Sequence, residues 1–295
     1  MSHDAAPLIH ADGRVLAAID PSHYATSVAR YAAWAATRMA APLELLHAID
    51  HVHGKPATTD LSGNLALGAQ DTLLDQLAAV DEQRGKLAQR QGRALLDAAR
   101  AQVAESHGIP AGTRQRHGTL LESLLELEPG VRLFVLGKRG EHADFASGHL
   151  GSNLERVVRA VHRPVLVAAR AFKPVERFLI AFDGSATTRK CVEMVGASPL
   201  LQGLEAHVLM VGEANVAADA HLDWARTQLQ AAGFDPIVEC LPGTPDTLIA
   251  QQVTERKIDL LVMGAYGHSR IRSLILGSTT TQVLRSCQIA VLLLR

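Results

Sequence analysis

Glycine and hydroxyl residues near the end of the chain are spaced to surround an anion. Gly264 and Gly267 precede Gly277 and Ser278, with nine residues between the second and third glycines. Glycine accepts positive φ and lets main-chain N–H groups approach an anion without an intervening Cβ. Residues 278–280 open a stretch with helical spacing, and the free N–H groups and dipole at a helix start favour phosphate. The pattern predicts a polyphosphate site, with a simple turn and a helix N-cap as the alternative interpretation.

An earlier glycine pattern is related to this one but departs from it. It consists of Gly137, Gly140, Gly151 and Ser152. Ten residues separate its second and third glycines, and Asn153 and Leu154 stand where the later pattern has two threonines. Lys138 and Arg139 add positive charge at positions that are uncharged in the later pattern. Three interpretations stay open for this first site: a nucleotide, a different anion, or a structural half without a ligand.

An aspartate follows an apolar run in both halves of the chain, as Asp20 and as Asp183. These runs belong to five sequence blocks that recur in the same order in the two halves. The first copy is longer, with extra residues at about 51–82. The repeat predicts a first domain over residues 1–171, which carries this insertion, and a second domain over 172–295.

Short, nearly continuous apolar runs such as VLAAI and LFVLG are typical of strands buried on both faces. Helical spacing lies between such runs, for example over 27–40, 83–107 and 246–257. This alternation predicts an α/β fold: two tandem open parallel five-stranded sheets, each with helices on both faces and strand order 3-2-1-4-5. Ligands of such sheets bind beyond the carboxyl ends of the strands, where Asp20 and Asp183 fall.

The composition argues against several classes of function. Lys and Arg number 29 and Asp and Glu number 30, a balance that argues against a protein tracking a nucleic-acid backbone. No apolar run has the roughly 20 residues needed to cross a bilayer, and the first residues do not resemble a signal peptide. Cys191, Cys240 and Cys287 form no CxxC pair, which favours reduced thiols in a cytoplasmic protein.

The sequence lacks the familiar motifs of catalysis. It has no GxxxxGK[ST] loop, no GxSxG elbow and no HExxH. We therefore expect a binding protein rather than an enzyme, with no catalytic residue. His47, His51 and His53 cluster after the second apolar run, where solvated loop histidines are favoured over a metal site. His268 follows Gly267 and is a candidate donor to phosphate.

These motifs resemble those of the universal stress protein family in its tandem two-domain form. Nucleotide-binding members of that family carry G-x2-G-x9-G-(S/T), which the second copy matches in full and the first copy does not. The resemblance covers nearly the whole chain and implies a Rossmann-like, adenine nucleotide alpha hydrolase-like fold. It also implies binding of ATP or a related adenine nucleotide, usually with Mg²⁺, and mainly in the second domain.

The resemblance gives each matching residue an expected role. Asp183 would lie by the base and ribose, flanked by Phe182, and Val211 would pack on the adenine. Met263 and Gly264 would line the gap. The ribose and phosphates would meet Gly267, Gly277, Ser278, Thr279 and Thr280. The weaker first site would use Asp20, Gly137, Gly140, Gly151 and Ser152.

Single-domain members of this family form dimers, so a tandem chain resembles such a dimer fused covalently. The last apolar runs, 163–170 and 288–295, are the expected pairing edges, since an exposed apolar edge must be covered. A further dimer of two tandem chains stays open.

Three functions stay open. The first is a nucleotide-binding sensor or regulatory module of a stress response. The second is a slow ATPase or phosphotransferase in which Asp183 positions Mg²⁺. The third is an interaction scaffold that docks through the insertion 51–82. Its segment 61–80 has apolar residues at helical spacing, interpreted as core packing, a lid over the first site or a partner helix.

Overall fold

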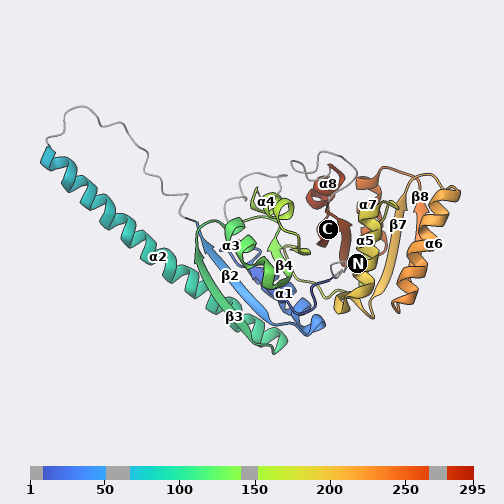
Figure 1. Cartoon of the computed structure of the whole chain (residues 1–295), viewed down its shortest axis with the longest axis horizontal. Helices are drawn as coiled ribbons and strands as arrows, with labels where there is room; N and C mark the ends of the chain where they lie inside the picture. The colour runs from blue at the N-terminus through green and yellow to red at the C-terminus, as the bar shows by residue number, and fades with distance from the viewer. Residues whose placement is uncertain (1–8, 51–66, 141–151, 266–277) are drawn as a thin grey trace, which may run out of the picture.

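The computed structural model describes residues 9–50, 67–140, 152–265 and 278–295, within which ten strands form one sheet (Figure 1). The first half contributes β1 (Arg14–Ala18), β2 (Leu43–Ile49), β3 (Ala111–His117), β4 (Val131–Gly137) and β5 (Val165–Ala168). Its helices are α1 (Ala25–Met39), α2 (Leu67–His107), α3 (Leu120–Leu127) and α4 (Ser152–Ala160), with the 3-10 helix η2 at Glu128–Gly130.

The second half repeats this order of elements. Its strands are β6 (Arg177–Ala181), β7 (Glu205–Val211), β8 (Ile237–Leu241), β9 (Leu260–Gly264) and β10 (Ala290–Leu294). Its helices are α5 (Ala186–Ala197), α6 (Val216–Ala231), α7 (Pro245–Glu255) and α8 (Ser278–Ser286), with the 3-10 helix η3 at Pro199–Leu201. The division of the chain between residues 171 and 172 stays a prediction.

Both halves have the predicted strand order 3-2-1-4-5, and within each half neighbouring strands pair in parallel. The halves join where β5 and β10 pair antiparallel, with Leu166 opposite Leu292 and Val167 opposite Val291. We call this β5–β10 junction the seam. The predicted pairing of the last apolar runs is therefore confirmed.

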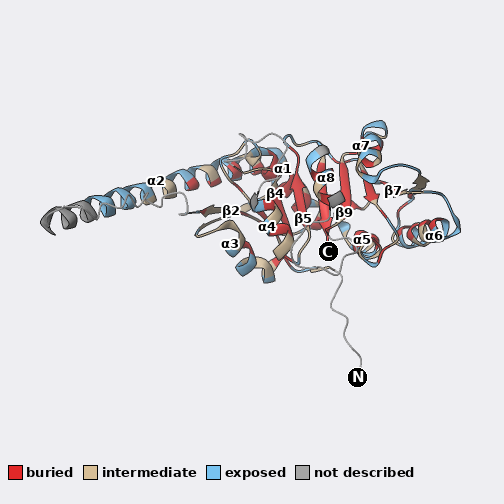
Figure 2. Cartoon of the chain, turned by 90° about the horizontal axis from the view of Figure 1, so that it is seen from above, coloured by how far each residue is buried: buried red, intermediate tan, exposed pale blue. Residues whose placement is uncertain are grey.

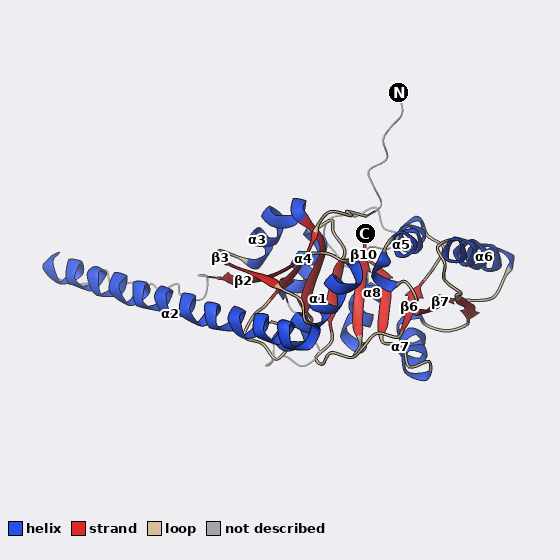
Figure 3. Ribbon diagram, turned by 90° about the horizontal axis from the view of Figure 1, so that it is seen from below, coloured by secondary structure: helices blue, strands red, loops and turns tan. Residues whose placement is uncertain are grey.

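Helices cover both faces of the sheet, as predicted (Figure 3). α1, α2, α5 and α6 pack on one face, and α3, α4, α7 and α8 pack on the other. The central strands are buried between these layers (Figure 2), which explains their continuous apolar runs. Among the described residues, every helix is too short or too polar to span a bilayer.

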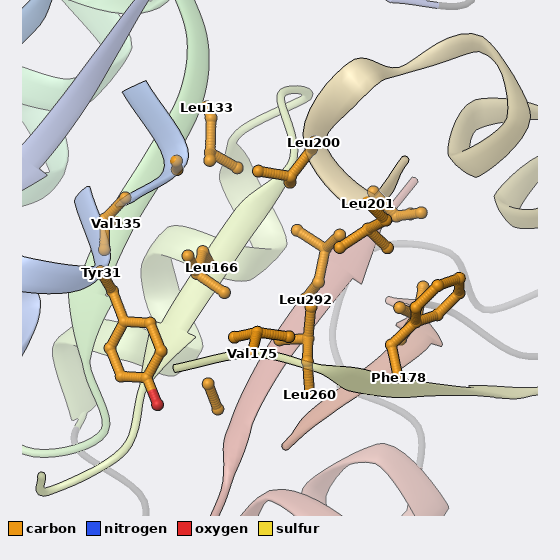
Figure 4. Close-up of a cluster of buried hydrophobic side chains, with 14 of the residues drawn as sticks. Tyr31, Leu133, Val135, Leu166, Val175, Phe178, Leu200, Leu201, Leu260 and Leu292 are labelled. Atoms are coloured by element: carbon orange, nitrogen blue, oxygen red, sulfur yellow. The ribbon is translucent and has the colours of Figure 1, made fainter. Parts of the chain in front are cut away.

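One apolar cluster continues across the seam (Figure 4). Tyr31, Val135 and Leu166 come from the first half, and Leu260 and Leu292 come from the second. All five side chains are buried. Burial of apolar surface stabilises a fold by roughly 25 cal/mol per Å². The shared cluster therefore ties the stability of each half to the presence of the other.

Two cationic side chains cap helix ends across the seam. Lys138, just past β4, is only 8% exposed, and its ammonium donates to the carbonyl oxygen of Cys287, just past α8. Arg295, just past β10, donates to the carbonyl oxygens of Arg159 and Val161 at the end of α4, at 3.1 and 3.0 Å. Carbonyl groups at a helix C-terminus lack intrahelical partners and favour cations. Each half therefore caps a helix that belongs to the other.

The structure corrects the predicted start of the long helix at residue 83. α2 is a single helix of 41 residues that begins at Leu67. Residues 67–82, predicted as part of the insertion, therefore continue directly into the helix predicted over 83–107. Residues 51–66 lie outside the described part of the chain.

Only the second part of α2 packs on the sheet, where Leu96 and Val103 are buried. In the first part, Leu77, Val80 and Leu87 are 41%, 43% and 55% exposed. Figure 2 shows this part of the helix extending away from the sheet. Core packing, one predicted interpretation of the segment 61–80, is therefore wrong for residues 76–80, which are all exposed.

Shortening one seam side chain tests the shared core. Leu292→Ala leaves a cavity opposite Leu166, so we expect the free energy of unfolding to fall by about 2–5 kcal/mol. Ile237→Ala on the edge strand β8 is the matched control, because Ile237 is 44% exposed, and should cost less than about 1 kcal/mol. Urea unfolding followed by circular dichroism measures both. Equal losses would contradict a shared core at the seam.

The pH dependence of stability tests the burial of Lys138. Burial lowers the pKa of Lys138 from 10.5 to about 8. Between these values the unfolded chain binds a proton that the folded chain has released, so the free energy of unfolding rises with pH. We compare the unmodified chain with Lys138→Met by subtracting the variant's free energy of unfolding from that of the unmodified chain. This difference should rise by up to about 3 kcal/mol as the pH increases from about 8 to 10.5. Urea titrations across the window measure it, and a flat or falling difference would contradict the buried amine.

Candidate functional site

The two predicted sites lie where neighbouring strands end. β6 and β9 pair in parallel, so the residues past their carboxyl ends share one edge of the sheet. Asp183 follows β6, and Gly264 ends β9. β1 and β4 pair in the same way, which places Asp20 near Gly137 in the first half. In both halves this is the point where strand order reverses and where open α/β sheets bind ligands.

Asp183 is exposed and held by a turn that leads into α5. Its Oδ1 accepts hydrogen bonds from the main-chain N–H of Ser185 at 2.9 Å and from the hydroxyl of Thr188 at 2.7 Å. Ser185 is also the N-cap of α5, where its hydroxyl accepts from the main-chain N–H of Thr188. Gly184 has a φ of 75°, in the left-handed region that favours glycine. The turn therefore fixes a carboxylate at the edge of the sheet.

Gly264 lies against the first turn of the same helix. A Cβ at this position would come within 2.9 Å of Cγ2 of Thr187, so a larger residue would displace α5 or β9. The hydroxyl of Thr280 donates to the carbonyl oxygen of Gly264 at 3.4 Å, which brings the first turn of α8 to the end of β9. Two helix starts thus meet the end of one strand, and each brings main-chain N–H groups and the positive end of its dipole.

Three residues that the resemblance places beside the nucleotide are wholly or partly buried. Phe182 stacks on Trp224 of α6, with ring centroids 6.2 Å apart. Met263 is buried in the apolar cluster under α7 and α8, and Val211 is partly buried against the same cluster. Packing of Phe182 and Met263 therefore positions the residues that follow them in the chain. Their contacts with a nucleotide stay a prediction.

Several predicted site residues lie outside the described part of the chain. These are Gly151, Gly267, His268 and Gly277. Ser278 and Thr279 begin α8, so the helix start predicted after the glycine pattern is confirmed. Ser152 begins α4 in the same way.

The first half builds a related arrangement. A Cβ at Gly137 would come within 2.9 Å of Cβ of Tyr24, and Tyr24 stands at the position that Thr187 occupies in the second copy. A Cβ at Gly140 would lie 3.2 Å from Oδ2 of Asp20. The structure therefore brings together Asp20, Gly137 and Gly140, as the repeat predicts.

The turn after the first strand differs between the halves. Pro21 follows Asp20, where the second half has Gly184. Proline locks φ near −65° and is excluded from the left-handed conformation of that glycine. Tyr24, the N-cap of α1, makes no side-chain capping hydrogen bond, whereas Ser185 caps α5. Both aspartates nevertheless accept from the main-chain N–H two residues on, Asp20 from Ser22 at 3.2 Å, so the halves differ in the residue after the aspartate and in the helix cap.

The prediction that Lys138 adds positive charge to the first site is wrong. Its ammonium turns to the seam and donates to the carbonyl oxygen of Cys287. The end of α8 offers this cation a buried acceptor that sequence order does not reveal. Ala265 stands at the corresponding position of the second copy and is also buried, so both positions face the interior. Arg139 is partly exposed.

Sequence reasoning missed a cation beside the Asp183 turn. Arg189 donates through Nε to the carbonyl oxygen of Gly184 at 3.1 Å and through Nη2 to Nδ1 of His221 at 2.7 Å. Its guanidinium also lies 4.5 Å from the ring centre of Trp224. The arginine is on α5 and its two ring partners are on α6, so no local spacing signals the cluster.

Of the histidines predicted to be solvated in a loop after the second strand, His47 instead lies within β2 and is partly buried. His47 donates through Nδ1 to the carbonyl oxygen of Ile19 at 2.8 Å. Among the described residues, no group of three His, Cys, Asp or Glu side chains is arranged to hold a metal ion. His51 and His53 lie outside the described residues.

Comparisons with known proteins find relatives over nearly the whole chain. The family model described as the universal stress protein family matches residues 13–169 and 210–295. Universal stress protein Slr1230 of Synechocystis sp. is 37% identical over 284 residues, which cover 95% of this chain and 99% of that protein.

Solved structures show the same fold. A universal stress protein from Archaeoglobus fulgidus DSM 4304 matches with a TM-score of 0.70 and 20% identity, over 96% of this chain and 98% of its own. A functionally unknown protein from Pseudomonas aeruginosa PAO1 matches with a TM-score of 0.58 and 16% identity, over 96% of this chain and 93% of its own. The family model matches more than half of the sequence, and the curated relative matches nearly all of it. The chain therefore belongs to the universal stress protein family.

Proposed function

We propose that this protein binds an adenine nucleotide, ATP with Mg²⁺, at the second site, and that binding regulates the protein in a stress response. The observation that carries the proposal is that Asp183 and Gly264 both lie against the first turn of α5, Asp183 bonded to Thr188 and Gly264 beside Thr187. The Asp183 carboxylate and the end of β9 therefore lie at the same edge of the sheet. At that strand end Gly264 has no room for a Cβ. Thr280 ties the start of α8 to the same strand end.

The residues present fit this ligand. Gly264 lets the main chain approach a ligand closely, and the starts of α5 and α8 supply N–H groups and positive dipole ends for phosphate. Asp183 supplies carboxylate oxygen, the ligand type that Mg²⁺ prefers. Bound Mg²⁺ would neutralise phosphate charge. Gly267, Gly277, Ser278 and Thr279 complete the proposed phosphate cradle.

A regulatory role fits the groups around Asp183 better than turnover does. Among the described residues, Ser185 and Thr188 orient the carboxylate, and Arg189 is bonded to Gly184 and His221. These contacts position the Asp183 carboxylate and its turn for binding a ligand. A slow ATPase is the competing function, and ADP release above that of a protein-free blank would establish it.

Matched aspartate variants test the site. We expect Asp183→Ala to weaken Mg-ATP binding by about 10- to 100-fold, because a charged group that contacts the ligand and its metal is lost. Asp20→Ala makes the same change at the corresponding position of the first copy and should weaken binding less than about threefold. Isothermal titration calorimetry measures both, with circular dichroism as the folding control.

Asp183→Asn separates charge from turn geometry, because its amide oxygen still accepts from Ser185. It should reduce the dependence of ATP affinity on Mg²⁺. Unchanged affinity in Asp183→Ala, or an equal loss in Asp20→Ala, would contradict a second-site nucleotide. An unmodified chain that releases no nucleotide on denaturation and gives no heat with Mg-ATP would remove the proposal.

The exposed part of α2 favours a second function, association of two tandem chains. Leu77, Val80 and Leu87 are large apolar side chains on a helix that extends away from the sheet, and their spacing places them on one helix face. Pairing with the same face of a second copy would bury them.

The double variant Leu77→Ser with Leu87→Ser tests this association. A buried leucine stabilises a contact by roughly 1.5–3 kcal/mol, so we expect the dimer dissociation constant to rise at least about tenfold. Val216→Ser is the control, because Val216 is 86% exposed at the start of α6. Sedimentation equilibrium measures both. A monomeric unmodified chain, or an equal shift in the control, would contradict the dimer.

A further inference from the structure

A cavity of about 150 Å³ lies between the two halves. It is bounded by the end of α1, the start of β4, the last two turns of α5, η3 and β10. None of the described residues assigned to either nucleotide site lines it. The cavity is therefore separate from the site proposed for ATP.

The cavity is lined by positive charge. Four cationic residues are among those that line it: Arg132, Arg163, Lys190 and Arg295. Among its described lining residues there is no Asp or Glu. An anion would therefore be drawn into this space.

Contacts with main-chain carbonyls leave donors of Arg132 unused. Arg132 donates through Nη1 to the carbonyl oxygens of Ala11 at 3.1 Å and Met39 at 3.4 Å. A guanidinium carries five N–H donors, so others remain for a ligand. Burial lowers the pKa of Arg132 more than the nearby charge of Asp12 raises it. This cation is therefore partly desolvated, and its charge is only partly compensated.

Two further groups near the cavity bear on its charge. Glu128 accepts from the main-chain N–H of Arg163 at 3.0 Å and is not part of the lining. His10 lines the cavity, and its Nδ1 is buried without a hydrogen-bond partner among the described residues. Buried polar atoms in folded proteins are nearly always hydrogen-bonded, so this nitrogen points to a missing partner.

Apolar side chains form the rest of the wall. Met194 and Val195 of α5, Leu200 and Leu201 of η3, and Leu292 of β10 all contribute, and all are buried. An inorganic anion would leave these groups facing empty or wet space. The volume equals about five water molecules and is below the roughly 300 Å³ of pockets for drug-sized ligands. The occupant is therefore small and partly apolar.

We propose that this cavity binds a small organic anion, namely a carboxylate or phosphate group joined to a short alkyl chain. The head group meets the arginine and lysine side chains, and the alkyl chain packs on the leucines and methionines. Because β4 and β10 belong to different halves, one ligand contacts both.

Calorimetric titration of the full chain with four probes tests the proposal. Hexanoate and hexyl phosphate carry both features, hexan-1-ol lacks the charge, and inorganic phosphate lacks the alkyl chain. We expect hexanoate or hexyl phosphate to bind at least about tenfold more tightly than either partial probe. The comparison of hexanoate with hexyl phosphate shows which head group the site prefers.

Lys190→Glu should weaken binding of the preferred probe about tenfold, because it reverses a charge in the lining. Lys86→Glu changes the net charge equally on the exposed part of α2 and should leave the affinity unchanged. Saturating Mg-ATP should not displace the probe. Equal affinity for hexan-1-ol, equal losses in the two variants, or displacement by Mg-ATP would each overturn the proposal, whatever the outcome for the nucleotide site.

Discussion

The β5–β10 pairing satisfies the main-chain groups of two strands that would otherwise be apolar edges of their half-sheets. Every residue of both strands is buried. A half on its own would expose this edge together with its share of the apolar cluster around Leu166 and Leu292. The outer edges of the joined sheet are instead β3 and β8, where no residue is fully buried. β3 carries Arg114 and Arg116, and such charges protect a free edge.

The seam also explains how the second site is held. The main-chain N–H of Ala265 donates to the carbonyl oxygen of Leu294 at 2.8 Å, so the strand end at Gly264 is fixed to β10. Lys138 of the first half holds the far end of α8, whose first turn carries Thr280. The first half therefore supports the proposed nucleotide site from outside it. Its lysine serves the second half as a helix cap rather than serving its own site as a phosphate ligand.

Much of this architecture could be predicted because it rests on local patterns. The repeated apolar runs predict the strand order and the edge pairing, and the glycines predict close approach at the ends of β4 and β9. Lys138, Arg189 and the shared cavity could not be predicted, because each depends on partners from other elements. The sequence left open whether the first part of α2 packs in the core or stays exposed. Helical spacing at Leu77 and Val80 indicates an apolar face but does not say what covers it.

α5 is the element that both proposed ligands would contact. Its start is capped by Ser185 beside Asp183, and its later turns present Lys190 and Met194 to the cavity. A ligand changes the affinity of another site only if it distinguishes between two arrangements of the protein. Thr187 lies beside Gly264 at one end of α5 and Met194 packs near the seam at the other, so a displacement of this helix would alter both sites. If one position of α5 suits both ligands, they would bind cooperatively, which agrees with a probe that saturating Mg-ATP does not displace.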